Sequence, residues 1–277
     1  MSTLAERERE YSPSSCIGGN YQPYIRAYIE QSAAARRSQA PTTIRYGSAD
    51  AQTFDLFLPP GVARPPVLVF FHGGYWQELS KRESAFAAPH CLAHGIAYAA
   101  IDYTLAPQAT LDEIVVECRA AFSWLAGNGA TVGIDPGRLF VAGSSAGAHL
   151  AAMVALTAPT VVKGAVLVSG VYDLAPLIGT SIDEALRLDA TTAARNSPLG
   201  LPLKGFPPSL VCWGEIETES FKRQSRTFAQ TLRDAGARSE DFEIAGRNHF
   251  DVILDLADPA TELGQRTLGM IRAATSS

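Results

Sequence analysis

Short apolar runs, rich in valine, alanine and phenylalanine, alternate along this chain with longer stretches of helical character. Runs of this length, bounded by turn residues, predict buried strands. They lie at residues 67–71, 97–102, 138–142, 164–169, 208–213 and 241–245. Strands that alternate with helices are typical of repeated βαβ units. We therefore predict an α/β fold with a mostly parallel, doubly wound sheet.

The remainder of the chain is less regular. Residues 21–37 predict an N-terminal helix, and residues 44–45 with 53–58 predict an opening hairpin that Pro59-Pro60-Gly61 ends. Residues 175–206, rich in leucine, proline and threonine, are irregular enough to be a lid insertion. Although 277 residues would suggest about two domains by length, α/β folds of this size often form one, so a single domain over residues 1–277 with a small lid is favoured.

Composition excludes several classes of function. The net charge of −5 and the pI near 5.6 disfavour nucleic acid or an anionic membrane as a partner. No apolar stretch reaches the length of a transmembrane helix, and the charged N-terminus has no apolar signal core. The four cysteines, which show no paired spacing, are most simply reduced thiols in the cytoplasm: Cys16, Cys91, Cys118 and Cys212.

A pentapeptide of small residues carries the first chemical signal. Gly143-Ser144-Ser145-Ala146-Gly147 follows an apolar run and precedes the helical stretch that begins at Ala148. A Gly-x-Ser-x-Gly turn between a strand and a helix is the nucleophile elbow of α/β hydrolases, which exposes the serine hydroxyl above the sheet. The alternative is an ordinary small-residue turn. We interpret Ser145 as the nucleophile.

A second motif follows the run at 67–71, where the chain reads His72-Gly73-Gly74-Tyr75-Trp76. In hydrolases with this elbow, a loop of the His-Gly-Gly type supplies backbone N–H groups to the oxyanion hole, together with the residue after the nucleophile. Gly73, Gly74 and Ala146 are therefore the predicted donors. His72 is interpreted as a structural residue that holds this loop in place.

The serine requires a general base, and the chain has five histidines. His249 is favoured because it follows a predicted strand near the C-terminus, and the chain order of this class is serine, acid, histidine. His149 lies within the helix after the elbow, where packing is the commoner role. His90 and His94 are one helical turn apart, but no carboxylate or cysteine follows them at ligand spacing, so a metal pair is disfavoured.

The acid is expected between Ser145 and His249, just beyond the end of a strand. Glu215, Glu217 and Glu219 follow the strand at 208–213, and Asp173 follows the preceding strand. Position favours the loop after residue 213. The residues alone leave the three glutamates open.

Taken together, four segments resemble the α/β-hydrolase-type kynurenine formamidases (arylformamidases), which are close to the hormone-sensitive-lipase-like esterases. These segments are residues 72–76, 102–107, 143–147 and 214–225, and the resemblance covers most of the chain from about Tyr11 onward. The esterases usually carry a third glycine where Tyr75 stands. The family's Gly-Glu-x-Asp loop places its acid on Glu217, one methylene longer than the family's aspartate, with Glu215 still in play.

The resemblance implies hydrolysis of an N-formyl aryl amide, with N-formylkynurenine as substrate and kynurenine and formate as products. It also implies that residues 1–40 contribute to a lid. We expect Tyr75 and Trp76 to narrow the acyl site, unless Trp76 only packs the loop on the core, and Tyr103 to stack on an aryl leaving group. No metal or organic cofactor is needed. The only partner expected is a small-molecule substrate, and a homodimer is left open.

Two other functions are retained as alternatives. The first is a general carboxylesterase that acts on small short-chain esters. The second is a catalytically silent binding protein, because a fold alone does not fix function. A complete set of serine, histidine and acid disfavours the silent protein.

Overall fold

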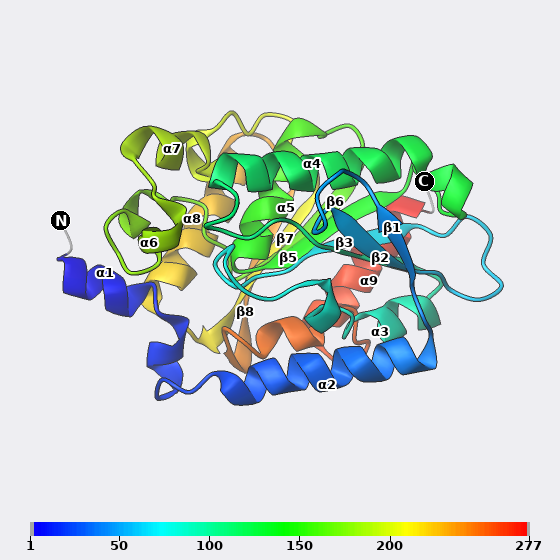
Figure 1. Cartoon of the computed structure of the whole chain (residues 1–277), viewed down its shortest axis with the longest axis horizontal. Helices are drawn as coiled ribbons and strands as arrows, with labels where there is room; N and C mark the ends of the chain where they lie inside the picture. Colours follow the sequence, from blue (N-terminus) through cyan, green and yellow to red (C-terminus); the bar gives the residue numbers. More distant parts are fainter. Residues whose placement is uncertain (1–2, 276–277) are drawn as a thin grey trace.

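A twisted sheet forms the centre of the molecule in this computed structural model, which describes residues 3–275 (Figure 1). These residues form eight strands: β1 (Thr42–Arg45), β2 (Thr53–Phe57), β3 (Val67–Phe71), β4 (Ala97–Ile101), β5 (Leu139–Ser144), β6 (Val162–Val168), β7 (Ser209–Ile216) and β8 (Ser239–Asn248). Their spatial order is β1-β2-β4-β3-β5-β6-β7-β8. The pairs β1/β2 and β2/β4 are antiparallel, and the rest are parallel. The predicted α/β fold is confirmed.

The central strands form where the sequence is apolar because both faces of the sheet are covered. Every residue of β3, β4 and β5 is buried. Along β3, Val67, Val69 and Phe71 pack into the core on one face, whereas Leu68 and Phe70 pack into the core on the other. The predicted opening hairpin is also present, as β1 and β2.

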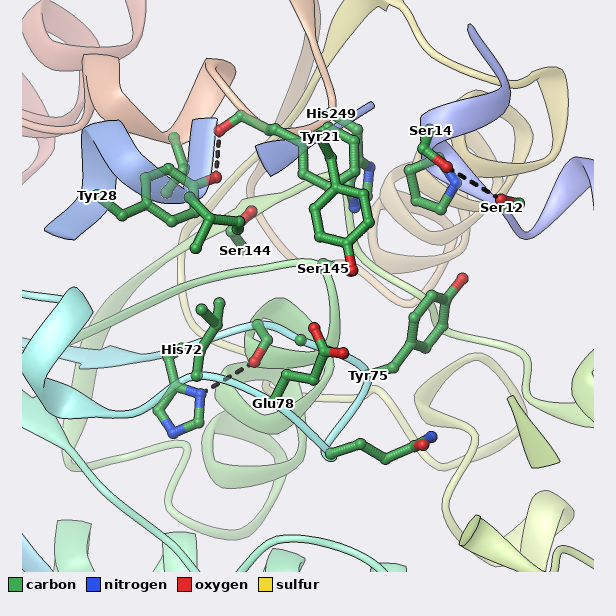
Figure 2. Close-up of a pocket in the computed structure, with 18 of the residues that line it drawn as sticks. Ser12, Ser14, Tyr21, Tyr28, His72, Tyr75, Glu78, Ser144, Ser145 and His249 are labelled. Atoms are coloured by element: carbon green, nitrogen blue, oxygen red, sulfur yellow. Dashed lines mark hydrogen bonds between the residues drawn. The ribbon is translucent and has the colours of Figure 1, made fainter. Parts of the chain in front are cut away.

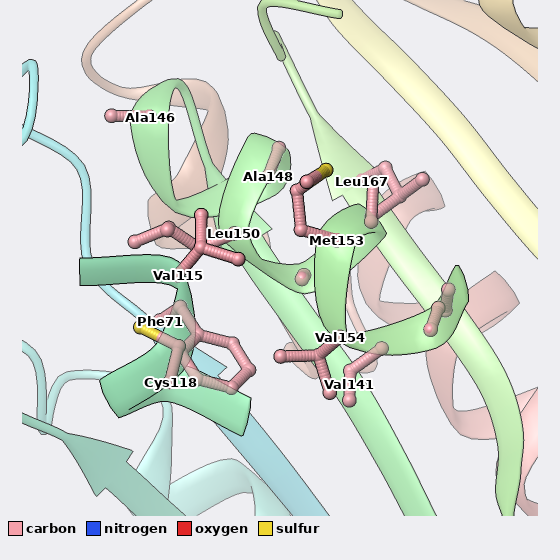
Figure 3. Packing of buried hydrophobic residues seen from close by; sticks show 14 of the residues in the cluster. Phe71, Val115, Cys118, Val141, Ala146, Ala148, Leu150, Met153, Val154 and Leu167 are labelled. Carbon is pink, nitrogen blue, oxygen red and sulfur yellow. The ribbon is translucent and has the colours of Figure 1, made fainter. Parts of the chain in front are cut away.

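Helices cover both faces of the sheet (Figure 1). One face carries α4 (Leu111–Asn128), α5 (Ala146–Thr157) and α8 (Glu219–Asp234), and the other carries α2 (Gln22–Ser38), α3 (Ala88–Ala93) and α9 (Glu262–Thr275). Because every residue of α5 from Ala146 to Ala155 is buried, this helix is apolar all round. Figure 3 shows it packed between the sheet and residues Val115 and Cys118 of α4.

Short helices occupy the two segments in which a lid is expected. The N-terminal segment contains α1 (Leu4–Glu10) and the 3₁₀ turn η1 (Pro13–Ile17). Residues 175–206 contain η4 (Ala175–Leu177), α6 (Asp183–Leu186), α7 (Ala190–Arg195) and η5 (Pro198–Gly200). The remaining 3₁₀ turns are η2 (Lys81–Glu83), η3 (Gly129–Val132) and η6 (Val252–Asp255).

The two segments are joined to each other at the carboxyl edge of the sheet, where α1 lies beside α6 (Figure 1). Glu8 accepts hydrogen bonds from the Ser181 backbone N–H at 2.6 Å and from its hydroxyl at 2.8 Å. Arg7 donates to the Ile178 carbonyl at 3.1 Å. These contacts hold the helix α1 at the edge of the sheet at which the predicted site residues lie. None of the helices within residues 3–275 combines the length and apolar character needed to cross a membrane.

Candidate active site

A cavity of about 650 Å³ opens at the carboxyl edge of the sheet. Ser145 and His249 line it together with the Gly73-Gly74-Tyr75 loop (Figure 2). The N-terminal segment contributes residues between Glu8 and Ser15, and Ser181 and Ile182 come from the second expected lid segment. The cavity therefore brings together parts of the chain that are far apart in the sequence.

Ser145 occupies the sharp turn that the pentapeptide predicts. The strand β5 ends at Ser144 and the helix α5 begins at Ala146, while Ser145 itself has φ 57° and ψ −122°. Such a backbone is rare for a residue with a side chain and persists only where the surrounding structure holds it. The flanking glycines permit it: a Cβ at Gly143 would lie 2.1 Å from the Gly147 carbonyl oxygen, and one at Gly147 would lie 2.0 Å from the Phe71 oxygen.

The three predicted oxyanion donors lie beside this turn. A Cβ on Gly73 would be 2.8 Å from the Ser144 carbonyl oxygen and 3.4 Å from the Ser145 Cβ, so the glycine loop approaches the elbow closely. Gly74 has φ +92°. Within residues 3–275, the backbone N–H groups of Gly73, Gly74 and Ala146 have no protein acceptor. Ala146 is also the first residue of α5, where unpaired N–H groups and the helix dipole favour negative charge.

His249 and Glu217 form a buried pair. The Nδ1 of His249 lies 2.8 Å from Oε2 of Glu217. The other oxygen of this carboxylate accepts hydrogen bonds from the Gly214 backbone N–H at 2.7 Å and from the Ser169 hydroxyl at 2.5 Å. Because an ionised carboxylate can only accept, Nδ1 must carry the proton of the neutral imidazole. This leaves the lone pair of Nε2 available to act as a base.

The other three carboxylates that the sequence left open make different contacts. Glu215 is exposed and accepts a hydrogen bond from the Gly246 backbone N–H at 2.8 Å. Glu219 pairs with Arg226 at 2.8 Å on the surface. Asp173 accepts from the Ala175 N–H at 3.1 Å. The structure thus brings Glu217 to His249 and directs the other three elsewhere.

The remaining histidines have structural environments. The buried His72 ring stacks on Tyr103 with centroids 4.2 Å apart, and its Nδ1 lies 2.9 Å from the Gly73 carbonyl oxygen. His149 lies 2.7 Å from the Asn196 carbonyl oxygen, and burial lowers its pKa to about 4. His94 contacts the backbone of His90 at 2.8 Å. Residues 3–275 contain no group of three or more metal-ligating side chains that could hold an ion.

Two of the predicted substrate-binding residues are not placed in the cavity. Trp76 is fully buried, and its ring meets His149 edge-on at 5.1 Å. Tyr103 is buried beneath the glycine loop, where its hydroxyl donates to the His72 carbonyl at 2.9 Å. The structure therefore favours the alternative in which Trp76 only packs the loop on the core. The expectation that Tyr103 stacks on the leaving group was wrong, because its ring packs inward against His72.

Tyr75 does line the cavity. Its hydroxyl donates a hydrogen bond to the Tyr11 carbonyl at 2.5 Å, and burial raises its pKa well above the usual value. The ring is held in place from both ends, by the glycine loop and by the N-terminal segment. Of the three expected substrate-binding side chains, it is the one beside the predicted nucleophile.

Sequence reasoning missed an aromatic group on the other side of the cavity. Tyr21 and Phe250 line the cavity and stack on each other with centroids 5.4 Å apart, and Tyr24 stacks on the same phenylalanine at 5.8 Å. Tyr28 also lines it and donates a hydrogen bond to the Phe250 carbonyl. The signal was present, because the three tyrosines recur at helical spacing in residues 21–28 and so share one face of α2.

Comparisons with known proteins identify the family of this chain. Residues 68–252 match the model of a family described by its alpha/beta hydrolase fold. The kynurenine formamidase of Danio rerio is 33% identical to this chain over 291 residues, which covers 96% of each protein. The esterase LipQ of Mycobacterium tuberculosis is 31% identical over 248 residues, covering 78% of this chain and 59% of the esterase.

A solved structure is similar over nearly the whole length. It is a putative thioesterase from Silicibacter, with a TM-score of 0.84 and 28% sequence identity, and the match covers 96% of this chain and 99% of the other. The similarity to the fish enzyme likewise covers 96% of this chain. The chain belongs to the kynurenine formamidase family of α/β hydrolases.

Proposed function

We propose that this protein is a serine hydrolase that cleaves an N-formyl aryl amide, N-formylkynurenine, to kynurenine and formate. The observation that carries the proposal is the arrangement of Ser145, the His249–Glu217 pair and the glycine loop around one cavity. The similarity to kynurenine formamidases over nearly the full length supports the choice of substrate.

The proposed reaction follows from the roles of these groups. The Ser145 hydroxyl oxygen attacks the formyl carbon while Nε2 of His249 takes the hydroxyl proton, and Glu217 stabilises the resulting imidazolium. The negative charge on the formyl oxygen is held by the N–H groups of Gly73, Gly74 and Ala146. His249 then protonates the departing aryl amine, which leaves a formyl ester on Ser145.

Water completes the cycle by the same steps. His249 takes a proton from a water molecule, whose oxygen attacks the formyl ester. The second oxyanion collapses, the proton returns to the Ser145 oxygen, and formate leaves. The enzyme is regenerated without any other reactant.

The cavity fits an aryl substrate with a small acyl group. Its volume of about 650 Å³ lies within the range that holds a small aromatic metabolite. Tyr75 provides a fixed ring beside the glycine loop, and Tyr21 with Phe250 provides aromatic surface on which an aryl ring can stack. The N-terminal segment and residues 175–206 are proposed to cover this cavity during the reaction.

A general carboxylesterase is the second candidate. The specific observation in its favour is the 31% identity to an esterase, because the same catalytic groups would hydrolyse an ester. The two functions differ in the acyl group and in the leaving group that the cavity accepts. The direct test is turnover of N-formylkynurenine by the purified protein, compared with 4-nitrophenyl acetate and butyrate.

We expect release of kynurenine, followed by its absorbance, with a specificity constant well above those for the two esters. Turnover of the esters without any release of kynurenine would assign the protein to the carboxylesterases instead. The reaction is proposed to take place in the cytoplasm. All four cysteines are free thiols and three of them are buried, as expected in a reducing compartment.

A further inference from the structure

Glu78 lies one turn beyond the glycine loop and lines the cavity. The Gly74 carbonyl accepts hydrogen bonds from the backbone N–H groups of Gln77 at 2.9 Å and of Glu78 at 3.0 Å, so the turn fixes Glu78 close to a proposed oxyanion donor. Figure 2 shows the Glu78 carboxylate directed toward the space between Ser145 and Tyr75. A negative charge therefore lies near the place where the reaction creates another.

This carboxylate differs from the other acidic side chains that line the cavity. Glu8 is held by Ser181, and Glu83 accepts a hydrogen bond from the Ser80 hydroxyl at 2.7 Å. Within residues 3–275, the Glu78 side chain has neither a hydrogen-bond donor nor a cationic partner. Its position is exposed to the cavity. The protein itself thus leaves the charge of Glu78 uncompensated.

An uncompensated carboxylate in this place has a cost for catalysis. Two negative charges on the walls of one cavity repel each other, so Glu78 raises the energy of the oxyanion that forms on a neutral substrate. A substrate that carries its own positive charge near Glu78 removes this repulsion and gains a charge-assisted hydrogen bond. N-formylkynurenine has such a group, since its ammonium lies on the side chain ortho to the formamide.

We propose that Glu78 is a specificity-determining residue that binds the ammonium group of the substrate and disfavours neutral aryl substrates. The proposal rests on the proposed function, because it takes an aryl formamide with an amino-acid side chain as the substrate. Beyond the proposed function, it names the ammonium group as the recognised part of the substrate and Glu78 as the residue that binds it. Removing the charge of Glu78 should then have opposite effects on a zwitterionic substrate that carries an ammonium group and on an aryl formamide that lacks one.

The experiment compares two formamides with wild-type protein and Glu78→Gln. N-formylkynurenine carries the ammonium group, whereas 2-formamidoacetophenone keeps the aryl ring, the ketone and the formamide without it. For Glu78→Gln we expect kcat/KM to fall about 10- to 100-fold for N-formylkynurenine, the loss of one hydrogen bond to a charged group. For the neutral formamide we expect a rise of about two- to fivefold, because the repulsion is relieved.

Two further variants separate recognition from structure. Glu78→Asp keeps the charge and should retain the wild-type order of preference, and Glu83→Gln removes a charge elsewhere on the cavity wall and should leave the ratio of the two constants unchanged. An unchanged ratio in Glu78→Gln, or an equal fall for both substrates, would overturn the proposal. If wild-type protein hydrolysed neither formamide, the proposed function itself would fail, which is a separate result.

Discussion

At the scale of single residues, the position of Ser145 is set by the backbone conformation of the turn. Its φ of 57° is maintained by β5 on one side and α5 on the other, and by two glycines that allow those elements to approach. Because the backbone supplies the position, the hydroxyl can be removed without disturbing the fold. The role of the hydroxyl is therefore separable from its structural setting.

We expect Ser145→Ala to abolish turnover, with a loss of about a million-fold in kcat, because no other nucleophile can start the cycle. The circular dichroism spectrum and the unfolding midpoint should stay close to those of the wild type. Ser144→Ala is the matched control and should be mild. A greater loss in the control than in Ser145→Ala would show that the elbow has been assigned to the wrong serine.

Glu217 is expected to act on His249 through orientation and charge. Glu217→Gln should lower kcat by about ten-thousand-fold, because an amide can present the wrong group to Nδ1 and cannot stabilise the imidazolium. Glu215→Gln, which changes a carboxylate bonded to the Gly246 backbone, should cost less than about tenfold. Steady-state kinetics of the two variants decide the matter, and equal losses in both would contradict the assignment.

Some residues of the candidate site could be predicted from the sequence and others could not, for physical reasons. Ser145 and the glycine loop could be predicted because local sterics require small residues at fixed positions around them. Glu217 could not be selected from the residues alone, since its contact with His249 depends on how two strand ends meet. Trp76 and Tyr103 were misplaced because distant residues, His149 and His72, determine which way the rings pack.

At the scale of elements, the turn from Gly74 to Leu79 connects the oxyanion loop to the core. Tyr75, Trp76 and Leu79 all have positive φ, at 50°, 61° and 70°. Backbone of this kind persists only when contacts on both sides hold it. Trp76 supplies the inner contact against α5 through His149, and Tyr75 supplies the outer one through its hydrogen bond to Tyr11.

Trp76→Ala is therefore expected to act on stability more than on selectivity. Removing a fully buried tryptophan should lower the free energy of unfolding by about 3–5 kcal/mol, as measured by urea denaturation. The order of preference among acyl groups should not change, because the ring does not line the cavity. If stability were unchanged and the preference among acyl groups were reversed, Trp76 would have to contribute to the acyl site after all.

The helices and strands that could be predicted from the sequence are mainly those that are buried. The strands β3 to β7 could be read from the sequence because burial on both faces leaves an apolar run. The ends of the strands could not be predicted in the same way. The strand β5 continues through Gly143 to Ser144, and β8 continues through polar residues to Asn248. The helix α1 was not foreseen, although Thr3 and Glu6 form a capping box that marks its start.

At the scale of the whole molecule, the order of the strands in the sheet brings the predicted catalytic residues close together. The ends of β3, β5, β7 and β8 lead to the glycine loop, Ser145, Glu217 and His249, all at the carboxyl edge of one parallel sheet. This part followed from the order of motifs along the chain. The two segments in which a lid is expected were also predicted from the sequence. Their contacts with each other, such as the hydrogen bond from Ser181 to Glu8, were not, because the two segments share no sequence pattern.

The cavity as a whole should limit the size of the acyl group. Tyr75 lines the cavity and donates a hydrogen bond to the N-terminal segment, so we expect it to form a rigid wall beside Ser145 that resists a longer acyl chain. An open apolar pocket would behave in the opposite way, since each added methylene gains about 1–3 kcal/mol of transition-state binding. Acyl-chain length is therefore the variable that separates a formamidase from a general esterase.

The most direct measurement is kcat/KM for the N-formyl, N-acetyl and N-butyryl derivatives of kynurenine, which share one leaving amine. We expect the formyl compound to be the best substrate, with a fall of about tenfold or more at each step, because every added group must displace the Tyr75 ring. A rise from formyl to butyryl would contradict the predicted limit on the size of the acyl group, and no release of kynurenine from the formyl compound would show that the protein is not a kynurenine formamidase.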